Sequence, residues 1–296
     1  MRASRAAACL VVLLGLTAPV GAARAADPWN PGGPGPSLVA TPDAFTLLAP
    51  PQVTGVRRWG HTLAGHVGTT SPAATSVRVQ WLRDGVPIPG AVRRTFTARP
   101  ADYGHRLAFR VELGRSGYAT TVRTSAPTIP IGHRVGVRKR FTYSIATRGR
   151  ISADLATFAR QAAETYADPR GWRAAGYLIT RVPRGGQFTL VLAAASTLPG
   201  FGSPCSATWS CRSGRYVVIN QTRWLHASPA WNAQHRSLRE YRHMVVDHET
   251  GHWLGHAHRG CPGPGDLAPV MMQQSKGLGG CRFNAFPLPS ERWTTR

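Results

Sequence analysis

Apolar and polar residues alternate in short runs between residues 42 and 131, which is the pattern of half-buried β-strands. The clearest runs are residues 76–83 and 108–113, and the turn-forming pair Asp84-Gly85 directly follows the first of them. Several such runs separated by turn residues predict an all-β sandwich. Since no cysteine lies in this stretch, packing alone must hold its strands together.

Near residue 138 the pattern changes to a mixture of strands and helices. Residues 152–167 have helical spacing, with Ser152 as the expected N-cap. The apolar face of this helix is expected to consist of Leu155, Phe158, Ala159 and Ala162. A second helix is predicted over residues 237–254. The remaining apolar runs predict strands at residues 141–147, 176–182, 187–194 and 216–220.

The first 41 residues predict export. Arg2 and Arg5 precede an apolar run, and Ala23-Arg24-Ala25 fits a signal-peptidase site, so residues 1–25 are expected to be a signal peptide. Residues 26–41 are rich in proline and glycine and are expected to be a linker. We therefore expect a secreted, extracellular protein whose folded part begins near residue 42.

Residues 248–258 contain the pattern H-E-x-x-H-x-x-G-x-x-H. On a helix, His248 and His252 lie on one face, so both imidazoles can bind one metal ion. Glu249 is the expected general base, which takes a proton from metal-bound water and returns it to the leaving amine. Three neutral histidines around an open position are typical of a catalytic Zn²⁺ site, so one zinc ion is the expected cofactor.

The third metal ligand has two candidates. If the helix stops at Gly255, whose residue type accepts a left-handed conformation, His258 can approach the metal from outside the helix. If the helix continues, His256 takes that place, because it lies four residues after His252. The pattern favours His258, since the Gly- and Pro-rich residues 258–265 cannot remain helical.

Two adjacent methionines, Met271 and Met272, follow a Pro-Val pair downstream of the motif. Their position resembles that of the methionine turn beneath the zinc of metzincin metallopeptidases, and we favour Met271 for this role. Filling of the core is the alternative role for either methionine. The group that stabilises the transition state stays unassigned among Arg259, Gln273, Gln274, His243 and a main-chain NH.

Four cysteines remain once Cys9 leaves with the expected signal peptide. An even number in an oxidising compartment favours two disulfides, for which three pairings are possible. We favour Cys205 with Cys211 and Cys261 with Cys281, because each pair closes a local Gly- and Pro-rich loop. Cys261 as a metal ligand is the disfavoured alternative, since a thiolate would close the open coordination position.

The chain is strongly basic, with 36 Lys and Arg against 13 Asp and Glu and a formal net charge of +23. One interpretation is a cationic surface that reflects genomic base composition. The other is attraction to an anionic cell-wall polymer or membrane surface through long-range fields. No nucleic-acid-binding motif is present, so no specific nucleic acid partner is expected. The sequence does not indicate an oligomeric state.

Two further resemblances bear on the fold. Residues 79–88 and 101–107 resemble immunoglobulin-like repeats of bacterial surface proteins, which implies Trp81 in the core and a spacer or adhesion role. Residues 138–290 are similar to an uncharacterised family of secreted actinobacterial zincin-like proteins, through motifs at residues 167–172, 205–211 and 260–265. Together they imply a multidomain fold class: an all-β immunoglobulin-like sandwich at residues 42–131, then an α+β zincin-like (metzincin) metallopeptidase domain at residues 138–296.

These patterns predict a secreted zinc metallopeptidase, most simply an endopeptidase, that acts on a peptide or protein substrate. The predicted strand at residues 216–220 is expected to be the sheet edge that pairs with the substrate backbone. The alternative function is a non-catalytic, zinc-containing binding or adhesion protein of the cell wall, whose β-sandwich and positive surface do the binding.

Overall fold

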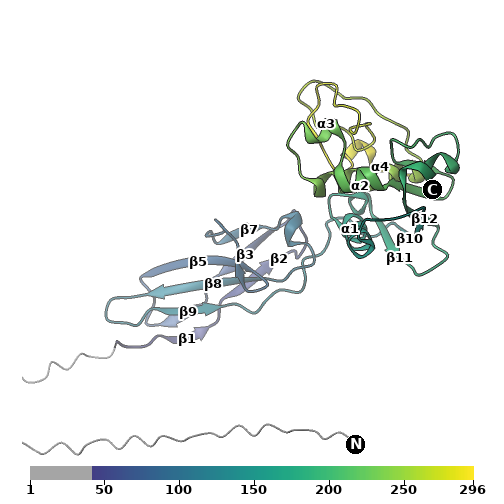
Figure 1. Cartoon of the computed structure of the whole chain (residues 1–296). Helices are drawn as coiled ribbons and strands as arrows, with labels where there is room; N and C mark the ends of the chain where they lie inside the picture. The colour runs from purple at the N-terminus through teal and green to yellow at the C-terminus, as the bar shows by residue number, and fades with distance from the viewer. Residues whose placement is uncertain (1–41) are drawn as a thin grey trace, which may run out of the picture. The chain divides into compact units, whose positions relative to one another are not determined.

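The structure of the protein, a computed structural model, describes residues 42–296. The predicted signal peptide and linker, residues 1–25 and 26–41, lie outside the described residues. Over the described part of the chain, no helix combines the length and apolar character needed to cross a membrane. Figure 1 shows a first part built from strands and a second part that contains the helices α1 to α4.

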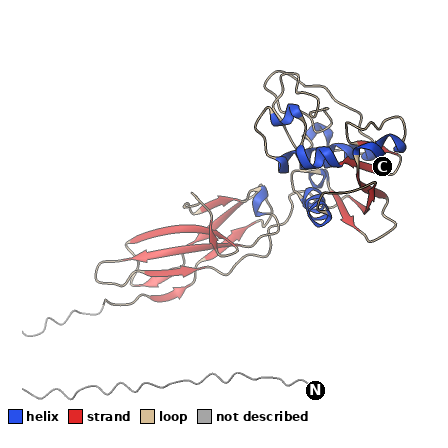
Figure 2. Cartoon of the chain, in the orientation of Figure 1, coloured by secondary structure: helices blue, strands red, loops and turns tan. Residues whose placement is uncertain are grey.

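The first part consists of antiparallel strands in three sheets, and Figure 2 shows it almost entirely in strand and loop. The predicted strands at residues 76–83 and 108–113 are confirmed as β5 and β8, which pair along their whole lengths. The sheets are β1 (Thr46–Ala49) with β4 (Thr69–Ser71); β2 (Gln52–Gly55), β3 (Thr62–His66) and β7 (Thr95–Thr97); and β6 (Val86–Pro87), β5 (Ser76–Arg83), β8 (Leu107–Gly114) and β9 (Thr121–Thr124).

Trp81 lies at the centre of the first part's core. Its side chain is fully buried and packs against Phe96 and Phe109, with ring centroids 5.6 and 5.2 Å away. The indole N–H donates to the backbone oxygen of Arg93 at 2.9 Å, so the buried polar group is satisfied. The expected core position of Trp81 is therefore confirmed.

The second part contains one five-stranded sheet in the order β11-β10-β12-β14-β13. Its first four strands in this order are parallel to one another, and β13 pairs antiparallel with β14. The central strands β12 and β14 are buried on both faces, as their continuous apolar sequences require. The five strands are β10 (Lys139–Arg148), β11 (Tyr177–Arg181), β12 (Phe188–Ala193), β13 (Cys211–Ser213) and β14 (Tyr216–Asn220).

The edge of this sheet is not the strand that the sequence suggests. Residues 216–220 do form a strand, β14, but it lies between β12 and β13. The three-residue strand β13 is the edge on this side of the sheet, and β11 is the edge on the other side. Strand β13 follows a disulfide-closed loop and is too short to show an alternating pattern, so nothing in the local sequence identifies it as a strand.

The helices of the second part are α1 (Leu155–Ala167), α2 (Gln221–His226), α3 (Pro229–Asn232) and α4 (Leu238–Leu254). The N-cap of α1 is Asp154, whose carboxylate accepts from the backbone N–H of Thr157 at 2.7 Å, so the expected Ser152 cap is wrong. Leu155 is also exposed. The buried face of α1 consists of Phe158, Ala162, Thr165 and Tyr166 and packs against α4.

Helix α4 begins and ends where its sequence predicts. Ser237 and Glu240 form a reciprocal capping box at its start. Its other end is Gly255, which has a φ of 103°, the left-handed conformation that glycine adopts without strain. The helix packs against α1, β13 and β14, so it lies over the sheet beside its edge strand (Figure 1).

The fold class expected from the sequence is wrong. The described residues do not form a two-sheet immunoglobulin-like sandwich followed by a zincin-like domain. They form a mixed, sheet-rich fold with four sheets and four α-helices, and the strands of the first part are divided among three of those sheets. Alternation of side chains identifies strands. It does not contain the long-range contacts that decide which strands pair, so local patterns cannot set the sheet topology.

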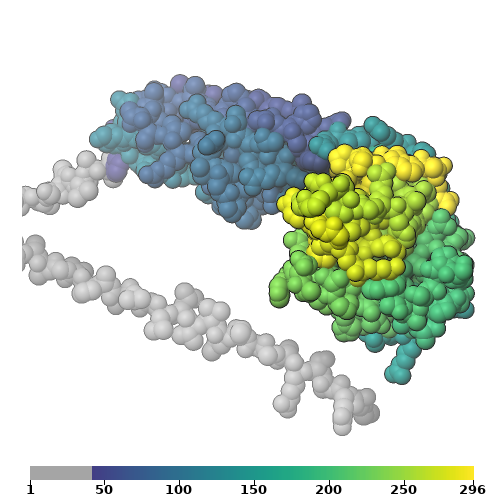
Figure 3. Space-filling view, turned by 90° about the horizontal axis from the view of Figure 1, so that it is seen from above, coloured from purple at the N-terminus to yellow at the C-terminus, as the bar shows by residue number. Residues whose placement is uncertain are grey.

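Both favoured disulfides are present, Cys205 with Cys211 and Cys261 with Cys281. The chain's last residues pack against the end of α4, and Figure 3 shows the C-terminal residues, in yellow, gathered on one face beside the green residues. Thr294 Oγ1 and Thr295 N both donate to the backbone oxygen of Leu254. The C-terminal segment therefore satisfies a carbonyl that the helix end leaves free.

Candidate metal centre

Helix α4 buries an unusual number of polar side chains. His243, Asp247, His248, Glu249 and Thr250 are all at most 9% exposed, although charged residues are rarely buried without partners. Four of these five belong to or adjoin the histidine motif. Burying a polar side chain costs stability, so these side chains of α4 are candidates for a functional site.

His248, His252 and His258 come together as the motif predicts. Each offers a ring nitrogen, and these three nitrogens all lie within 4.8 Å of one another. The Nε2 atoms of His252 and His258 are 3.1 Å apart. This cluster is close enough to hold one metal ion.

Backbone carbonyls fix the orientation of two of these rings. His248 Nδ1 lies 2.7 Å from the backbone oxygen of Val270, and His252 Nδ1 lies 2.8 Å from that of His256. Each contact places the ring proton on Nδ1 and leaves the Nε2 lone pair for a metal. The donor set therefore fits a divalent cation that prefers neutral imidazole.

The helix ends at Gly255, and the chain turns there so that His258 faces the other two histidines and His256 faces away from them. His256 Nε2 lies 2.6 Å from the backbone oxygen of Trp293, and its ring stacks on Trp172. It is therefore part of the packing behind the helix end. A Cβ at Gly255 would also lie 2.0 Å from Thr295 Oγ1, so glycine is required for space as well as conformation.

Burial keeps the metal-facing groups uncharged in the metal-free protein. Desolvation lowers the pKa of His248 to about 3 and that of His252 to about 4, and it also lowers the pKa of His258. Desolvation raises the pKa of Glu249 to about 8. Neutral imidazoles are the form that binds a metal, and a carboxyl with a pKa near neutrality suits proton transfer.

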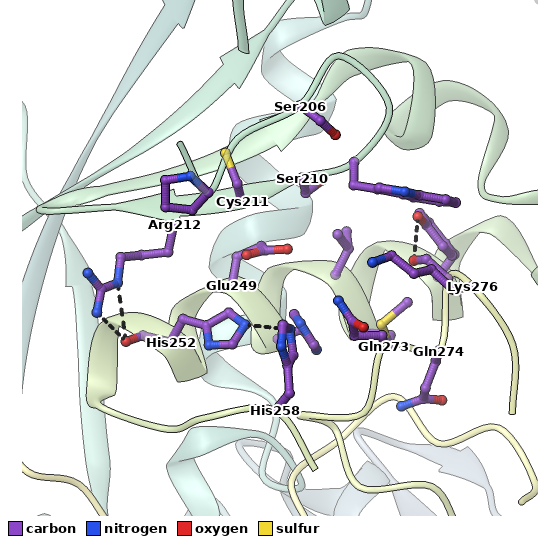
Figure 4. A pocket seen from close by; sticks show the side chains of 17 residues that line it. Ser206, Ser210, Cys211, Arg212, Glu249, His252, His258, Gln273, Gln274 and Lys276 are labelled. Carbon is purple, nitrogen blue, oxygen red and sulfur yellow. Dashed lines mark hydrogen bonds between the residues drawn. The ribbon is translucent and has the colours of Figure 1, made fainter. Parts of the chain in front are cut away.

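These side chains open into a cavity of about 410 Å³. Figure 4 shows Glu249 between Arg212 on one side and Lys276 on the other, with His252 and His258 below it. The carboxyl of Glu249 makes no hydrogen bond to any described residue, so it is free for a ligand. Three segments supply the other walls: the loop and edge strand at residues 204–212, helix α4, and residues 273–276.

Met271 lies directly beneath the helix, fully buried. A Cβ built on Gly251 would lie 2.3 Å from Met271 Sδ and 2.8 Å from Trp172 Cζ2. The methionine therefore fits against a helix surface that only glycine leaves open. Met272 is only partly buried, and the structure places Met271, the favoured residue, under the metal-facing turn.

Two side chains hold the Met271 segment in place: Glu291, which no sequence pattern indicates, and Gln274, a candidate for transition-state stabilisation. The buried carboxylate of Glu291 accepts backbone N–H groups from Val270 at 3.0 Å, Met271 at 2.9 Å and Leu288 at 2.8 Å. Gln274 Nε2 donates to the backbone oxygens of Pro269 and Asn284. Because Val270 in turn accepts from His248, Glu291 positions a metal-facing ring through the backbone.

The four side chains considered for transition-state stabilisation have different positions. Gln273 and Gln274 line the cavity, but the amide of Gln274 is bound to backbone oxygens. His243 lies 3.0 Å from Thr165 Oγ1 and outside the cavity walls, as does Arg259. Of the four, Gln273 is the one that lines the cavity and whose side chain has no hydrogen-bond partner among the described residues.

Replacing Gly251 by alanine is expected to destabilise the fold by about 1–3 kcal/mol, the usual cost of overpacking a core. The added Cβ would press on Met271 Sδ and on the Trp172 ring, neither of which can move freely. Gly260→Ala is the matched control, because a Cβ there meets nothing within 4 Å. Urea unfolding midpoints compare the two variants; equal midpoints would show that Met271 does not pack closely under the helix.

Metal-free protein is expected to lose stability as the pH rises from 6.5 to 8. The folded pKa of Glu249 is about 8 and its usual value is 4.5, so the folded state retains a proton that the unfolded chain releases. The depressed histidine pKa values act oppositely and remove stability only below 6.5, their usual value. Urea midpoints of chelator-treated protein should therefore fall above pH 6.5. Glu249→Gln should reduce that fall, and Asp247, whose pKa burial also raises, accounts for the part that stays. Identical profiles for the two proteins would contradict the buried, protonated carboxyl.

The comparison with protein families gives one match. Residues 115–289 match the model of DUF3152, described as a protein of unknown function, and these 175 residues are more than half of the 296-residue chain. The chain belongs to the DUF3152 family. No curated protein matches the chain. The DUF3152 match begins before β9 and covers both the five-stranded sheet of this chain and its whole histidine motif.

Proposed function

We propose that this DUF3152 protein is a secreted, zinc-dependent metallopeptidase that hydrolyses peptide bonds in the cavity above α4. The observation that carries the proposal is the convergence of His248, His252 and His258 beside a buried, unpaired carboxyl, Glu249. Two disulfides fit an oxidising compartment, in agreement with the signal peptide expected at residues 1–25.

Zinc is the metal that the donor set favours. Three neutral imidazoles suit Zn²⁺ better than Mg²⁺ or Ca²⁺, which prefer oxygen ligands. Cys261, the thiol nearest the motif, is bonded to Cys281 and cannot be a ligand. When bound, Zn²⁺ lowers the pKa of water and polarises a carbonyl group. The protein's part is to hold the three rings and keep water and peptide in the cavity.

Glu249 is the proton carrier in this proposal. It adjoins the first histidine of the motif and lines the cavity, and its carboxyl makes no hydrogen bond to any described residue. Its carboxylate takes a proton from the attacking water, and the resulting carboxyl passes that proton to the nitrogen of the leaving amine. A pKa near 8 in the metal-free protein makes both directions of transfer accessible near neutral pH.

The edge strand β13 is the part of the sheet best placed for a peptide. Cys211 and Arg212 of this strand line the cavity, and in the described sheet β13 pairs only with β14. Its other edge can accept the backbone of an extended chain. This assigns to β13 the role that the sequence suggests for residues 216–220.

The test is digestion of a mixed peptide library by the purified protein, with new peptide ends identified by mass spectrometry. Zinc-loaded protein should generate cleavage products, chelation should abolish them, and added Zn²⁺ should restore them. Protein that holds one zinc per chain and yields no products at any condition would contradict the proposal and favour a binding role for the centre.

A further inference from the structure

The cavity above α4 carries an uncompensated positive charge. Of the described residues that line it, Arg212 and Lys276 are the cations and Glu249 is the sole carboxylate. A bound zinc ion would add two further positive charges. An anionic ligand would therefore meet a favourable field at either end of the cavity.

The side chain of Lys276 has no structural partner among the described residues. It is exposed, and its ammonium group forms no hydrogen bond or ion pair with any described residue. Figure 4 shows it at the end of the cavity away from Arg212, beyond Gln273. The chain has only two lysines, Lys139 and Lys276, among 36 basic residues, so a flexible ammonium at this place is a distinct feature of the site.

Some N–H groups of the Arg212 guanidinium are not used in hydrogen bonds to described residues. Its Nε and one terminal nitrogen donate to the backbone oxygen of His252 at 3.3 and 3.1 Å. The other terminal nitrogen has no partner among the described residues. This arrangement holds the guanidinium beside a metal-facing ring and leaves part of it available to a carboxylate.

We propose that the cavity selects peptides that carry a carboxylate close to the scissile bond, with Lys276 and Arg212 as the residues that recognise it. This inference rests on the proposed peptidase function. The shared chemistry is a carboxylate on an extended peptide bound along β13. It can come from an acidic side chain or from the C-terminus of the substrate, and the two sources are distinguished by experiment.

The experiment compares matched peptides that differ at single positions around one cleavage site and carry Glu, Gln or Lys there, each with a free or an amidated C-terminus. The Glu peptide should be cleaved with a kcat/KM about fivefold to tenfold higher than the Gln peptide, and the Lys peptide should be poorest. If preference instead follows the free C-terminus, the carboxylate comes from the chain end. Equal rates for all peptides would overturn the inference.

Charge reversal identifies the recognising residue. Lys276→Glu should invert the ratio, so that the Lys peptide exceeds the Glu peptide, whereas Arg184→Glu should leave the ratio as in the wild type. Arg184 is the matched control because it is an exposed arginine of the same part that does not line the cavity. A ratio that both variants change equally would show a diffuse field and not a recognition site.

A binding assay keeps the two proposals separate. Fluorescently labelled Glu and Gln peptides are titrated with zinc-loaded Glu249→Gln protein, and anisotropy reports the dissociation constants. Tighter binding of the Glu peptide without cleavage by wild-type protein would retain the carboxylate site and reject the peptidase. Cleavage without any difference between the peptides would retain the peptidase and reject the carboxylate site.

Discussion

Replacing Glu249 by glutamine is expected to lower kcat/KM for peptide cleavage by about 10²–10⁴-fold, the usual contribution of a general acid–base group. The amide has nearly the shape of the carboxyl that it replaces but cannot accept a proton from water. Because Glu249 contacts no described residue through hydrogen bonds, the substitution leaves no partner unsatisfied. Steady-state kinetics on a cleaved peptide measure the loss, with zinc content determined in the same samples.

Asp247→Asn is the matched control for this substitution. Asp247 is the adjacent acid on α4, but it is fully buried, and burial raises its pKa well above the usual value. It does not line the cavity, so its carboxyl can be exchanged for an amide without loss of a catalytic proton. Cleavage should stay close to the wild-type rate. A Glu249→Gln protein that retains zinc and full activity would contradict the assigned role.

Replacing His258 by alanine is expected to weaken zinc binding by more than about 100-fold. Loss of an outer hydrogen-bonding partner of a ligand already costs about 10–100-fold in metal affinity, and a direct ligand should cost more. His258 is the most exposed ring of the cluster, and its ring makes no hydrogen bond to the backbone of any described residue, so its removal should leave the fold intact. Competition with a chromophoric chelator measures the affinity.

His256→Ala separates the two candidates for the third ligand. This substitution removes the contact with Trp293 and the stacking on Trp172, so it should lower stability while zinc stays at one ion per chain. The backbone oxygen of His256, which accepts from His252, is retained. If zinc were lost from His256→Ala and kept by His258→Ala, the assignment of ligands would be wrong.

The metal centre is predictable from sequence because its parts are local. His248, Glu249, His252, Gly255 and His258 lie within eleven residues, and one helix with one glycine stop decides their relative positions. The φ of 103° at Gly255 is a property of residue type and spacing, which a single sequence contains. The favoured disulfides also close short loops, so chain proximity is enough to suggest them.

Features of the fold and the site that depend on contacts between residues far apart in the sequence could not be predicted in this way. Glu291 binds the backbone 20 and 21 residues before it, and Arg212 binds the backbone of a residue 40 positions later. No spacing rule links such pairs. The edge strand and the fold class depend on strand pairing, which has the same long-range origin. Charge alone pointed to a positive surface, whereas the structure identifies Lys276 and Arg212 at the cavity.

X-ray absorption at the zinc edge of the purified, zinc-loaded protein tests the central claim most directly, because it reports the metal's ligands without reference to activity. Histidines 248, 252 and 258 around one ion predict a shell of three nitrogens at about 2.0–2.1 Å and an open position filled by one oxygen. The same spectrum of His258→Ala should show one nitrogen fewer. A sulfur shell at about 2.3 Å, or protein that takes up no zinc, would contradict the assignment of a catalytic three-histidine centre.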